Sequence, residues 1–323
     1  NASPELRSIT REEIKIPDVP YKGMVDETGK VGYLKLNSFT QTAGTEVRNA
    51  VKELKDQGAS KVILDLRGNG GGLLREAVNI VNLFTPKGET VVETKGRMAD
   101  WDKTYKTLSE PLDADIRLVV LTDTGSASAS EIVSGALQDL DRAVVMGQRT
   151  FGKGLVQQTR DLLYNSKLKV TVAKYYIPSG RCIQKLDYAQ HDSTGHAVVR
   201  ADSSLRGFKT RNGRPVIDGR GILPDVLVEE PEMPKVVVGL FAGDVLFDFA
   251  NQYYWSHDSI PPPGTFTITD DLWKDFTAFA HTRKVEYRTE SNEELKKLEE
   301  AAKRERYYDH AKEAFGSLRA ELN

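Results

Sequence analysis

The chain has 323 residues, of which 39% are hydrophobic and 28% are charged, a composition typical of globular domains with a sizeable core. Its 45 Lys and Arg residues nearly balance its 47 Asp and Glu residues, and the net charge of -2 excludes the basic footprint of a nucleic-acid-binding protein. No apolar run is long enough to span a bilayer. The single cysteine, Cys182, excludes an internal disulfide and a cysteine-based metal site.

The amino-terminal segment lacks the charged and apolar regions of a signal peptide, and it begins at Asn1 rather than at a methionine. We therefore expect a processed or cut chain in which Asn1 and Ala2 are an expression scar. Residues 5–20 carry spaced isoleucines and close with two prolines, which predicts a strand with a proline-rich exit. Because no partner strand follows directly, we interpret this segment as the tail of a further module.

Residues 31–185 show an alternation of strand and helix patterns. Short apolar or alternating runs predict strands at 31–36, 61–66, 117–121 and 143–146. Apolar residues at helical spacing predict helices between them, at 47–54, 74–81 and 129–137. Strands that alternate with helices indicate a largely parallel sheet covered by helices, which is an α/β fold.

The rest of the chain follows two other patterns. From about 155 to 230, period-two alternation at 167–173 and dense glycine and proline predict hairpins and loops, with 187–215 as an exposed excursion. In 236–323, a capping-box pattern at Ser291–Glu294 predicts the start of one or two final amphipathic helices. Helices with aromatic cores are predicted from Phe241, Val245, Phe249, Trp255, Trp273, Phe276 and Phe279.

The first segment suited to catalysis is Gly-Ser-Ala-Ser-Ala-Ser-Glu at 125–131, between a predicted strand and a predicted helix. A turn at this place exposes a nucleophile, and the free N–H groups of the helix amino terminus can stabilise an oxyanion. The alternative is a plain N-cap, because serine also satisfies those N–H groups.

Two further segments contain residues of the right chemistry. In Phe-Gly-Lys-Gly at 151–154, glycines on both sides of Lys153 permit close approach to another backbone; the alternative is a surface lysine on a loop. No Ser or Thr follows the lysine, so the segment is not a Walker loop. The glycine-rich loop at 65–72 can bind an anion through its N–H groups, but it lacks the fingerprint of dinucleotide binders and could be a flexible turn.

The positions of the histidines narrow the choice of mechanism. None of the five lies in the α/β part that holds these segments; they are His191, His196, His257, His281 and His310. A Ser-His-Asp triad therefore requires a peripheral loop to fold back, whereas a Ser-Lys pair requires no histidine. The histidines also lack the spacing of metal ligands, and we predict neither a metal nor a cofactor.

Taken together, the three segments occur in the order and at the spacing of one known family. They resemble the C-terminal processing (tail-specific) proteases, which are Ser/Lys peptidases with a crotonase-like α/β core. The resemblance continues through Tyr-Tyr-Ile-Pro-Ser-Gly-Arg at 175–181 and Gly-Ile-Leu-Pro-Asp at 221–225, and it covers about 5–230. The fold it implies is this core with a β-rich extension and a C-terminal helical region.

The resemblance implies a catalytic role for three side chains. Ser128, the middle serine of its segment, matches the nucleophile, Lys153 matches the general base, and Gln157 matches the glutamine that orients the base. A lysine must be neutral to accept a proton, which burial away from other charges favours, and a glutamine can hold the amine without adding negative charge. We therefore expect activity to rise from acid towards neutral and mildly alkaline pH.

The resemblance also implies an oxyanion hole. The Ala129 N–H is one donor, and the other comes from the glycine loop, from Gly71 or from Gly72. Asp139 matches an acidic position with a supporting role.

Family members carry a PDZ-type module that captures the carboxyl terminus of the substrate, and no segment here matches it. The resemblance therefore implies a linker or strand at 1–20 after a missing module, a peptidase core at 21–230, and a helical region at 236–323. The helical region matches no family motif that we can assign, and it packs on the core or mediates self-association.

The implied function is a serine endopeptidase that cleaves protein substrates at or near accessible C-termini, without nucleic acid or cofactor, in the periplasm or another extracytoplasmic compartment. One alternative is a non-catalytic ligand- or peptide-binding protein on the same fold, against which the intact Ser128, Lys153 and Gln157 argue. Another is an enzyme held inactive until a partner or the missing module engages, which an oxyanion donor turned away from the site would indicate.

Overall fold

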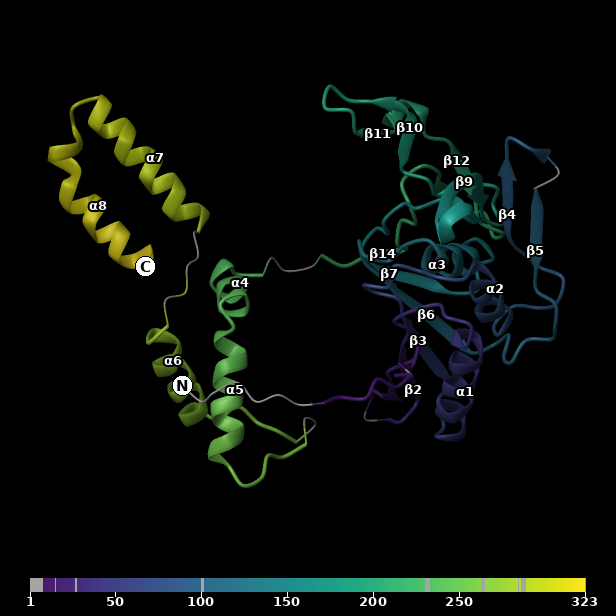
Figure 1. The fold of residues 1–323 in the computed structure, drawn as a ribbon, viewed down its shortest axis with the longest axis horizontal. Coiled ribbons are helices and arrows are strands. Elements are labelled where there is room, and N and C mark those ends of the chain that lie inside the picture. Colours follow the sequence, from purple (N-terminus) through teal and green to yellow (C-terminus); the bar gives the residue numbers. More distant parts are fainter. Residues whose placement is uncertain are drawn as a thin grey trace. The chain divides into compact units, whose positions relative to one another are not determined.

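A computed structural model describes residues 8–14, 16–26, 28–99, 102–229, 233–262, 265–283, 285 and 289–322 (Figure 1). The chain divides into two compact units, Asn1–Glu230 and Pro231–Asn323. In the described part, no helix combines the length and the apolar character that crossing a membrane requires.

A six-stranded sheet forms the centre of the first unit. Its strands, in spatial order, are β1 (Tyr21–Met24), β2 (Val31–Lys35), β3 (Lys61–Asp65), β6 (Arg117–Thr122), β7 (Val144–Gly147) and β14 (Val226–Leu227). All neighbours pair in parallel except β1 and β2, which are antiparallel. The four strands predicted between 31 and 146 are confirmed to within one residue at each end, and so is the largely parallel sheet.

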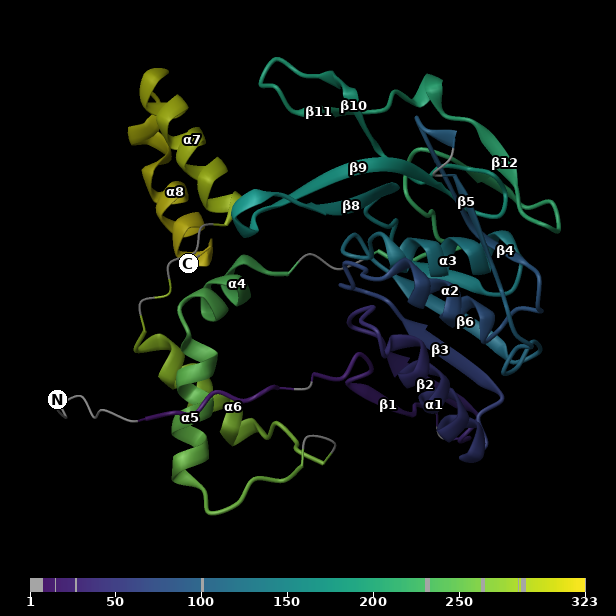
Figure 2. The ribbon, with the colours of Figure 1, turned by 45° about the vertical axis from the view of Figure 1, so that its right-hand side comes forward.

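A second, antiparallel sheet supplies the β-rich extension. Its strands, in spatial order, are β5 (Lys103–Lys106), β4 (Thr90–Gly96), β9 (Lys167–Tyr176) and β8 (Leu155–Asp161). The β8–β9 hairpin is long and projects beyond the rest of the sheet (Figure 2). The predicted hairpin character of 155–230 is confirmed, since two small hairpins follow: β10 (Leu186–His191) with β11 (Ala197–Val199), and β12 (Gly207–Lys209) with β13 (Pro215–Ile217).

Three helices form a row along the first sheet: α1 (Ala43–Asp56), α2 (Leu74–Asn82) and α3 (Ala129–Asp139). Helix α2 contacts both of the others, and α2 and α3 also contact β4, so the row lies between the two sheets. The predicted stripe of α1 is buried at Val47, Val51 and Leu54. The main hydrophobic core therefore includes buried residues of all three helices and of the strands that they cover.

The second unit consists of helices. Three are α4 (Lys235–Ala242), α5 (Val245–Ser256) and α6 (Asp270–His281), and two more are α7 (Glu290–Arg304) and α8 (Tyr308–Leu322). Helices α7 and α8 share a small core of Leu295, Ala302 and Phe315. The predicted helical region is thus confirmed.

The predicted aromatic cores of the second unit are only partly correct. The ring of Phe249 lies 5.3 Å from that of Phe276 and 5.5 Å from that of Phe279. Phe241, Trp255 and Trp273, by contrast, are 59%, 82% and 57% exposed within this structure. Helices this short offer one narrow apolar face, so aromatic residues outside that face stay on the surface.

Two local predictions are wrong. Residues 8–14 and 16–20 form no strand, and the first strand begins at Tyr21; residues 5–7 and 15 lie outside the described part. The carboxylate of Asp18, held by Thr40 and Thr42 at the start of α1, fixes the proline-flanked segment there instead. Helix α7 begins at Glu290 with Thr289 as its N-cap, accepting the Asn292 N–H at 3.1 Å, so the capping box does not start at Ser291.

Candidate active site

The turn after β6 leads directly into α3 and presents Ser128 at the helix amino terminus. Ser128 has a φ of 59° and a ψ of −111°, in a region that residues with a side chain rarely adopt. Such conformations are strained and persist only where surrounding contacts impose them, commonly at functional sites. The predicted position between a strand and a helix is therefore correct, and the turn is sharper than a plain N-cap requires.

The three serines of this turn have different surroundings. The hydroxyls of Ser126 and Ser130 are fully buried and donate to the Leu66 and Asn69 carbonyl oxygens, both at 2.9 Å. They fasten the turn to the glycine loop that follows β3. Ser128 remains 9% exposed, and its side chain lies near the Tyr175 phenol of β9. Burial raises the pKa of Tyr175, and the neighbouring Ser128 side chain opposes that rise. Of the three, only Ser128 is suited to meet a substrate.

The glycine loop begins at a buried carboxylate. Asp65 accepts hydrogen bonds from the Tyr33 hydroxyl at 2.6 Å and from the Arg67 guanidinium at 2.7 Å. Burial acts to raise the pKa of Asp65, but the donors of Arg67 and Tyr33 outweigh it and hold that pKa below its usual value. The same environment raises the pKa of Tyr33 to about 12. This cluster fixes the direction in which the loop leaves β3.

Gly71 lies directly against the nucleophile turn. A Cβ atom at Gly71 would come within 2.7 Å of the Ala127 carbonyl oxygen, 2.8 Å of the Ser128 Cβ and 2.9 Å of the Ala129 nitrogen, and its φ is +96°. Gly72 instead packs against the Phe39 carbonyl oxygen of the chain leading into α1. The structure thus brings Gly71 and the Ala129 N–H together, as the predicted oxyanion hole requires.

The two amides differ in their present partners. The Ala129 N–H belongs to the first turn of α3, where helical N–H groups lack an internal acceptor, and it has none among the described residues. The Gly71 N–H points to the Asn69 Oδ1 at 2.9 Å. One predicted donor is therefore open, and the other is turned towards a side chain.

The loop that carries Lys153 contacts the Ser128 turn, because the Phe151 N–H donates to the Ser126 carbonyl oxygen at 3.0 Å. A Cβ at Gly152 would lie 2.5 Å from the Lys185 Cβ, and one at Gly154 would lie 2.6 Å from the Gln184 nitrogen. The glycines on both sides of Lys153 therefore permit the predicted close approach to another backbone, and the segment approached is 184–185. Lys153 and Gln157 line one cavity of about 640 Å³, with Gln157 exposed on β8.

Glu131 joins the two loops, although the sequence reasoning gave it no role. Its side chain is fully buried in α3. One carboxylate oxygen accepts the N–H groups of Ser128 at 2.9 Å and Lys153 at 2.8 Å, and the other accepts the Gly152 N–H at 2.7 Å and the Thr150 hydroxyl at 2.6 Å. Burial raises the pKa of Glu131, and these four donors oppose the rise. The available signal was its place three residues after Ser128, which is the acceptor position of a capping box.

Glu131 thus holds the main chain at Ser128 and Lys153 within about two hydrogen-bond lengths of each other. The side chains are not yet joined: within the described residues, the Lys153 amine forms neither a hydrogen bond with Ser128 nor an ion pair. The predicted pair is adjacent through its backbone.

Asp139 lies at the opposite end of α3 from Ser128. It forms a buried ion pair with Arg181 at 2.8 Å and accepts the Ser179 N–H at 3.0 Å. This arrangement anchors the 175–181 segment to the helix, away from the nucleophile. Among the described residues, no group of three His, Cys, Asp or Glu side chains is placed to hold a metal ion.

The model of peptidase family S41 matches residues 30–192, which include the glycine loop, the Ser128 turn and the Lys153 loop. The chain belongs to peptidase family S41. A second model, of the probable PDZ-protease C-terminal helical domain, matches residues 236–323, so the region that we could assign to no motif has a family match of its own.

Curated proteins of similar sequence are named as proteases. The carboxyl-terminal-processing protease of Picosynechococcus sp. is 39% identical over 204 residues, covering 61% of this chain and 48% of that protein. The probable CtpA-like serine protease of Staphylococcus aureus (strain N315) is 35% identical over 265 residues, covering 81% of this chain and 41% of that protein. The chain thus spans about half the length of the curated relatives it matches, or less.

A solved structure agrees with the fold. The photosystem II D1 C-terminal processing protease superposes with a TM-score of 0.50 at 28% identity, over 70% of this chain and 52% of that one. The predicted family and the α/β protease-type fold with a C-terminal helical region are confirmed.

Proposed function

We propose that the chain is a serine endopeptidase that cleaves protein substrates at or near their carboxyl termini through a Ser128–Lys153 dyad. The observation that carries the proposal is the Ser128 turn. A strained serine begins α3 beside an open Ala129 N–H and the close-packed Gly71, while both neighbouring serines are committed to structural hydrogen bonds.

In the proposed reaction, the Ser128 hydroxyl attacks the scissile carbonyl, and Lys153 takes its proton and returns it to the leaving amine. The oxyanion is stabilised by the Ala129 N–H, the positive end of the α3 dipole and the Gly71 amide, with Gly72 as the alternative donor. Gln157, which lines the Lys153 cavity, orients the amine without bringing a negative charge. A water then repeats the attack to release the acyl product. No step needs a metal or cofactor.

A specific observation favours a second candidate state, an enzyme at rest. The Gly71 N–H is directed to Asn69, and within the described residues the Ser128 hydroxyl forms no hydrogen bond with the Lys153 amine. We propose that binding of a substrate or of a capturing module turns the Gly71 amide and completes the dyad. The same fold as a purely binding protein gains no support, because such a protein needs no strained serine at a helix terminus.

The test is cleavage of an unfolded protein, with fragments identified by mass spectrometry. We expect cleavage by the wild type to vanish in Ser128→Ala and Lys153→Ala and to be lowered but retained in Ser126→Ala, which removes a structural hydroxyl from the same turn. Cleavage that survives in Ser128→Ala would refute the assignment. Cleavage that appears only when a longer natural chain or a fused capturing module is assayed would support the resting state.

We also propose an extracytoplasmic location and self-association through the carboxyl-terminal helices. The first is supported by the family alone, and cell fractionation tests it. The second is supported by an apolar hollow of about 540 Å³ on α5 and α6, lined by Phe249, Tyr253, Trp273 and Phe276. Sedimentation of the wild type and Trp273→Ser tests it, and a monomer at high concentration would contradict it.

A further inference from the structure

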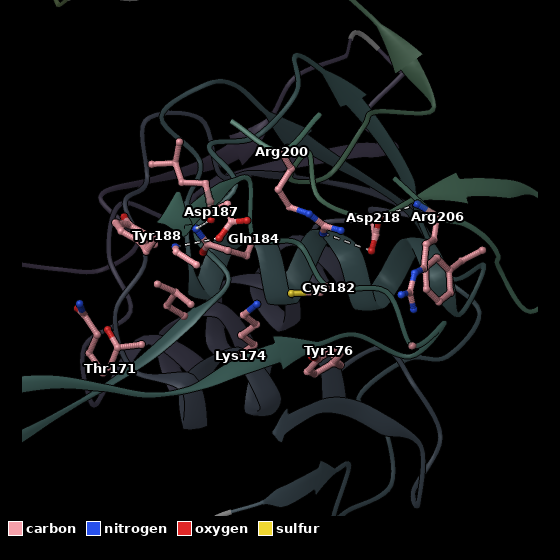
Figure 3. A pocket seen from close by; sticks show the side chains of 16 residues that line it. Thr171, Lys174, Tyr176, Cys182, Gln184, Asp187, Tyr188, Arg200, Arg206 and Asp218 are labelled. Atoms are coloured by element: carbon pink, nitrogen blue, oxygen red, sulfur yellow. Dashed lines mark hydrogen bonds and ion pairs between the residues drawn. The ribbon is translucent and has the colours of Figure 1, made fainter. Parts of the chain in front are cut away.

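A cavity of about 870 Å³ lies between the β8–β9 hairpin and residues 180–218 (Figure 3). Side chains alternate along β9, so Tyr175 meets Ser128 while Lys174 and Tyr176 line this cavity. The smaller cavity that contains Lys153 shares part of the same wall, made of Leu155, Gln157, Gln184, Leu186 and Tyr188. The two hollows therefore adjoin, and a peptide bound near Lys153 can extend into the larger one.

Cationic side chains dominate the lining of both hollows. Six are present, namely Arg149, Lys153, Lys174, Lys185, Arg200 and Arg206, against two carboxylates, Asp187 and Asp218. The whole chain carries a net charge of -2, so this positive excess is local. Asp218 is already engaged, since it accepts the Arg206 backbone N–H at 2.8 Å and lies 3.5 Å from the Arg200 guanidinium. Asp187 accepts the Ala189 N–H at 2.9 Å.

Three of these cations, Lys174, Arg200 and Arg206, line the larger cavity, and two of the three have no partner of opposite charge among the described residues. Neither the Lys174 amine nor the Arg206 guanidinium forms a hydrogen bond or ion pair with another described residue. Figure 3 shows the Cys182 sulfur between Lys174 and Arg200. Burial raises the pKa of the Cys182 thiol, and Lys174 and Arg200 oppose that rise, so their charge acts on the cavity wall itself. Tyr176 and Phe208 add apolar wall to the same cavity, which keeps water from screening a bound anion fully.

We propose that this cavity is a carboxylate-binding subsite, in which Lys174 and Arg206 bind an acidic group of the substrate at a fixed distance from the scissile bond. The inference rests on the proposed peptidase function. An ammonium and a guanidinium suit a carboxylate, because charge-assisted hydrogen bonds are the stronger class. The carboxylate comes from an aspartate or glutamate side chain or from the terminus of the peptide. The protease unit itself then favours substrates that carry an acidic group at this position.

The test measures binding and cleavage separately. Amidated peptides carry one glutamate at successive positions with glutamine elsewhere, and a further peptide carries only glutamine with a free terminal carboxylate. Binding is measured by fluorescence anisotropy on the Ser128→Ala chain at low and high salt, and kcat/KM is measured on the wild type. Cleavage that depends on a glutamate identifies a side-chain source, and cleavage that depends on the free terminus identifies a terminal source.

We expect at least one acidic peptide to bind about tenfold tighter than its glutamine counterpart, the scale of one charge-assisted hydrogen bond, with a preference that weakens in salt. The ratio should fall towards one in Lys174→Gln/Arg206→Gln. It should persist in Lys169→Gln, which removes an exposed lysine of β9 outside both hollows. If the double variant folds poorly by circular dichroism, Lys174→Glu should turn the preference towards lysine-bearing peptides.

Equal binding of acidic and neutral peptides, or a preference that survives in the double variant, would overturn the subsite. Failure of the proposed function gives a different result: acidic peptides would still bind more tightly to Ser128→Ala, but the wild type would cleave none of the peptides, either alone or with a fused capturing module.

Discussion

Substituting Glu131 with glutamine tests whether one buried carboxylate sets the geometry of the site. The carboxylate accepts four donors at 2.6–2.9 Å. Glutamine keeps the shape but replaces one acceptor oxygen with an NH₂ donor. In one orientation the N–H groups of Ser128 and Lys153 lose their acceptor. In the other, the Gly152 N–H loses its acceptor and the Thr150 hydroxyl must turn. Each buried polar group left unsatisfied costs about 1–3 kcal/mol, so we expect a total loss of about 2–4 kcal/mol in the free energy of unfolding.

The effect on catalysis should exceed the effect on folding. Positioned proton transfer contributes about 10²–10⁴-fold to rate, and Glu131→Gln releases one of the two chain segments that Ser128 and Lys153 need. We expect kcat/KM to fall about 10²-fold in protein that is still folded. Urea unfolding measures the first quantity, and cleavage of a fluorogenic peptide under conditions of full folding measures the second.

Glu76→Gln is the matched control. Glu76 is also buried in a helix and accepts a backbone N–H, that of Gly44 at 2.8 Å, but it touches neither loop of the site. It should lower stability and leave kcat/KM of the folded protein near the wild-type value. If Glu131→Gln retained wild-type kcat/KM, or if Glu76→Gln lost as much, the positioning argument would be refuted.

Three further variants test other parts of the structure. Gly71→Ala introduces a Cβ within 3 Å of the nucleophile turn at a positive φ, with strain of about 1–3 kcal/mol. This variant should lower kcat/KM more than tenfold. Gly70→Ala is the control, because a Cβ there has no neighbour within 4 Å, and it should retain activity. Arg181→Met leaves Asp139 buried without its partner and should lower the urea-measured stability by about 3–5 kcal/mol; a neutral result would contradict the ion pair's role. The pKa of Asp65 is depressed in the fold, so its stabilising contribution is present above its unfolded value of 3.8 and is lost as pH falls through the lower folded value. Asp65→Asn should therefore flatten the loss of stability on acidification below about pH 4, and parallel acid unfolding curves would disprove this.

Sequence patterns predict the first unit well where they report on burial. The strands at 61–65 and 117–122 and the helix at 129–139 all have an apolar period that matches their surroundings, so local preference and tertiary packing agree. The patterns fail where contacts across the chain decide the outcome. Residues 8–14 and 16–20 have apolar side chains suited to a strand, yet Ile9, Ile14 and Ile16 are exposed because no neighbouring strand pairs with them.

The candidate site shows the same division. The position of Ser128 follows from the strand, the turn and the helix that surround it. Its distinction from Ser126 and Ser130 does not follow from the local pattern, because it depends on which hydroxyls reach the carbonyls of a loop about sixty residues earlier. The role of Glu131 could not be predicted from the local sequence either, because three of its four hydrogen-bond donors lie about twenty residues further along the chain.

The Gly-Ile-Leu-Pro-Asp segment at 221–225 also contacts the hydrogen-bonded cluster around Glu131. The Thr150 hydroxyl donates to Glu131 and accepts the Ile222 N–H at 2.7 Å. Gly221 lies so close that a Cβ would come within 2.7 Å of that hydroxyl and 3.1 Å of the Glu131 carboxylate. The backbone strain at Ser128 is of order 1–3 kcal/mol. It is offset by the charge-assisted hydrogen bonds to the buried Glu131, whose donors come from more than one loop. A serine held in this way cannot relax without breaking contacts in the Lys153 loop, which is why the two proposed catalytic segments should respond together to a substitution in either.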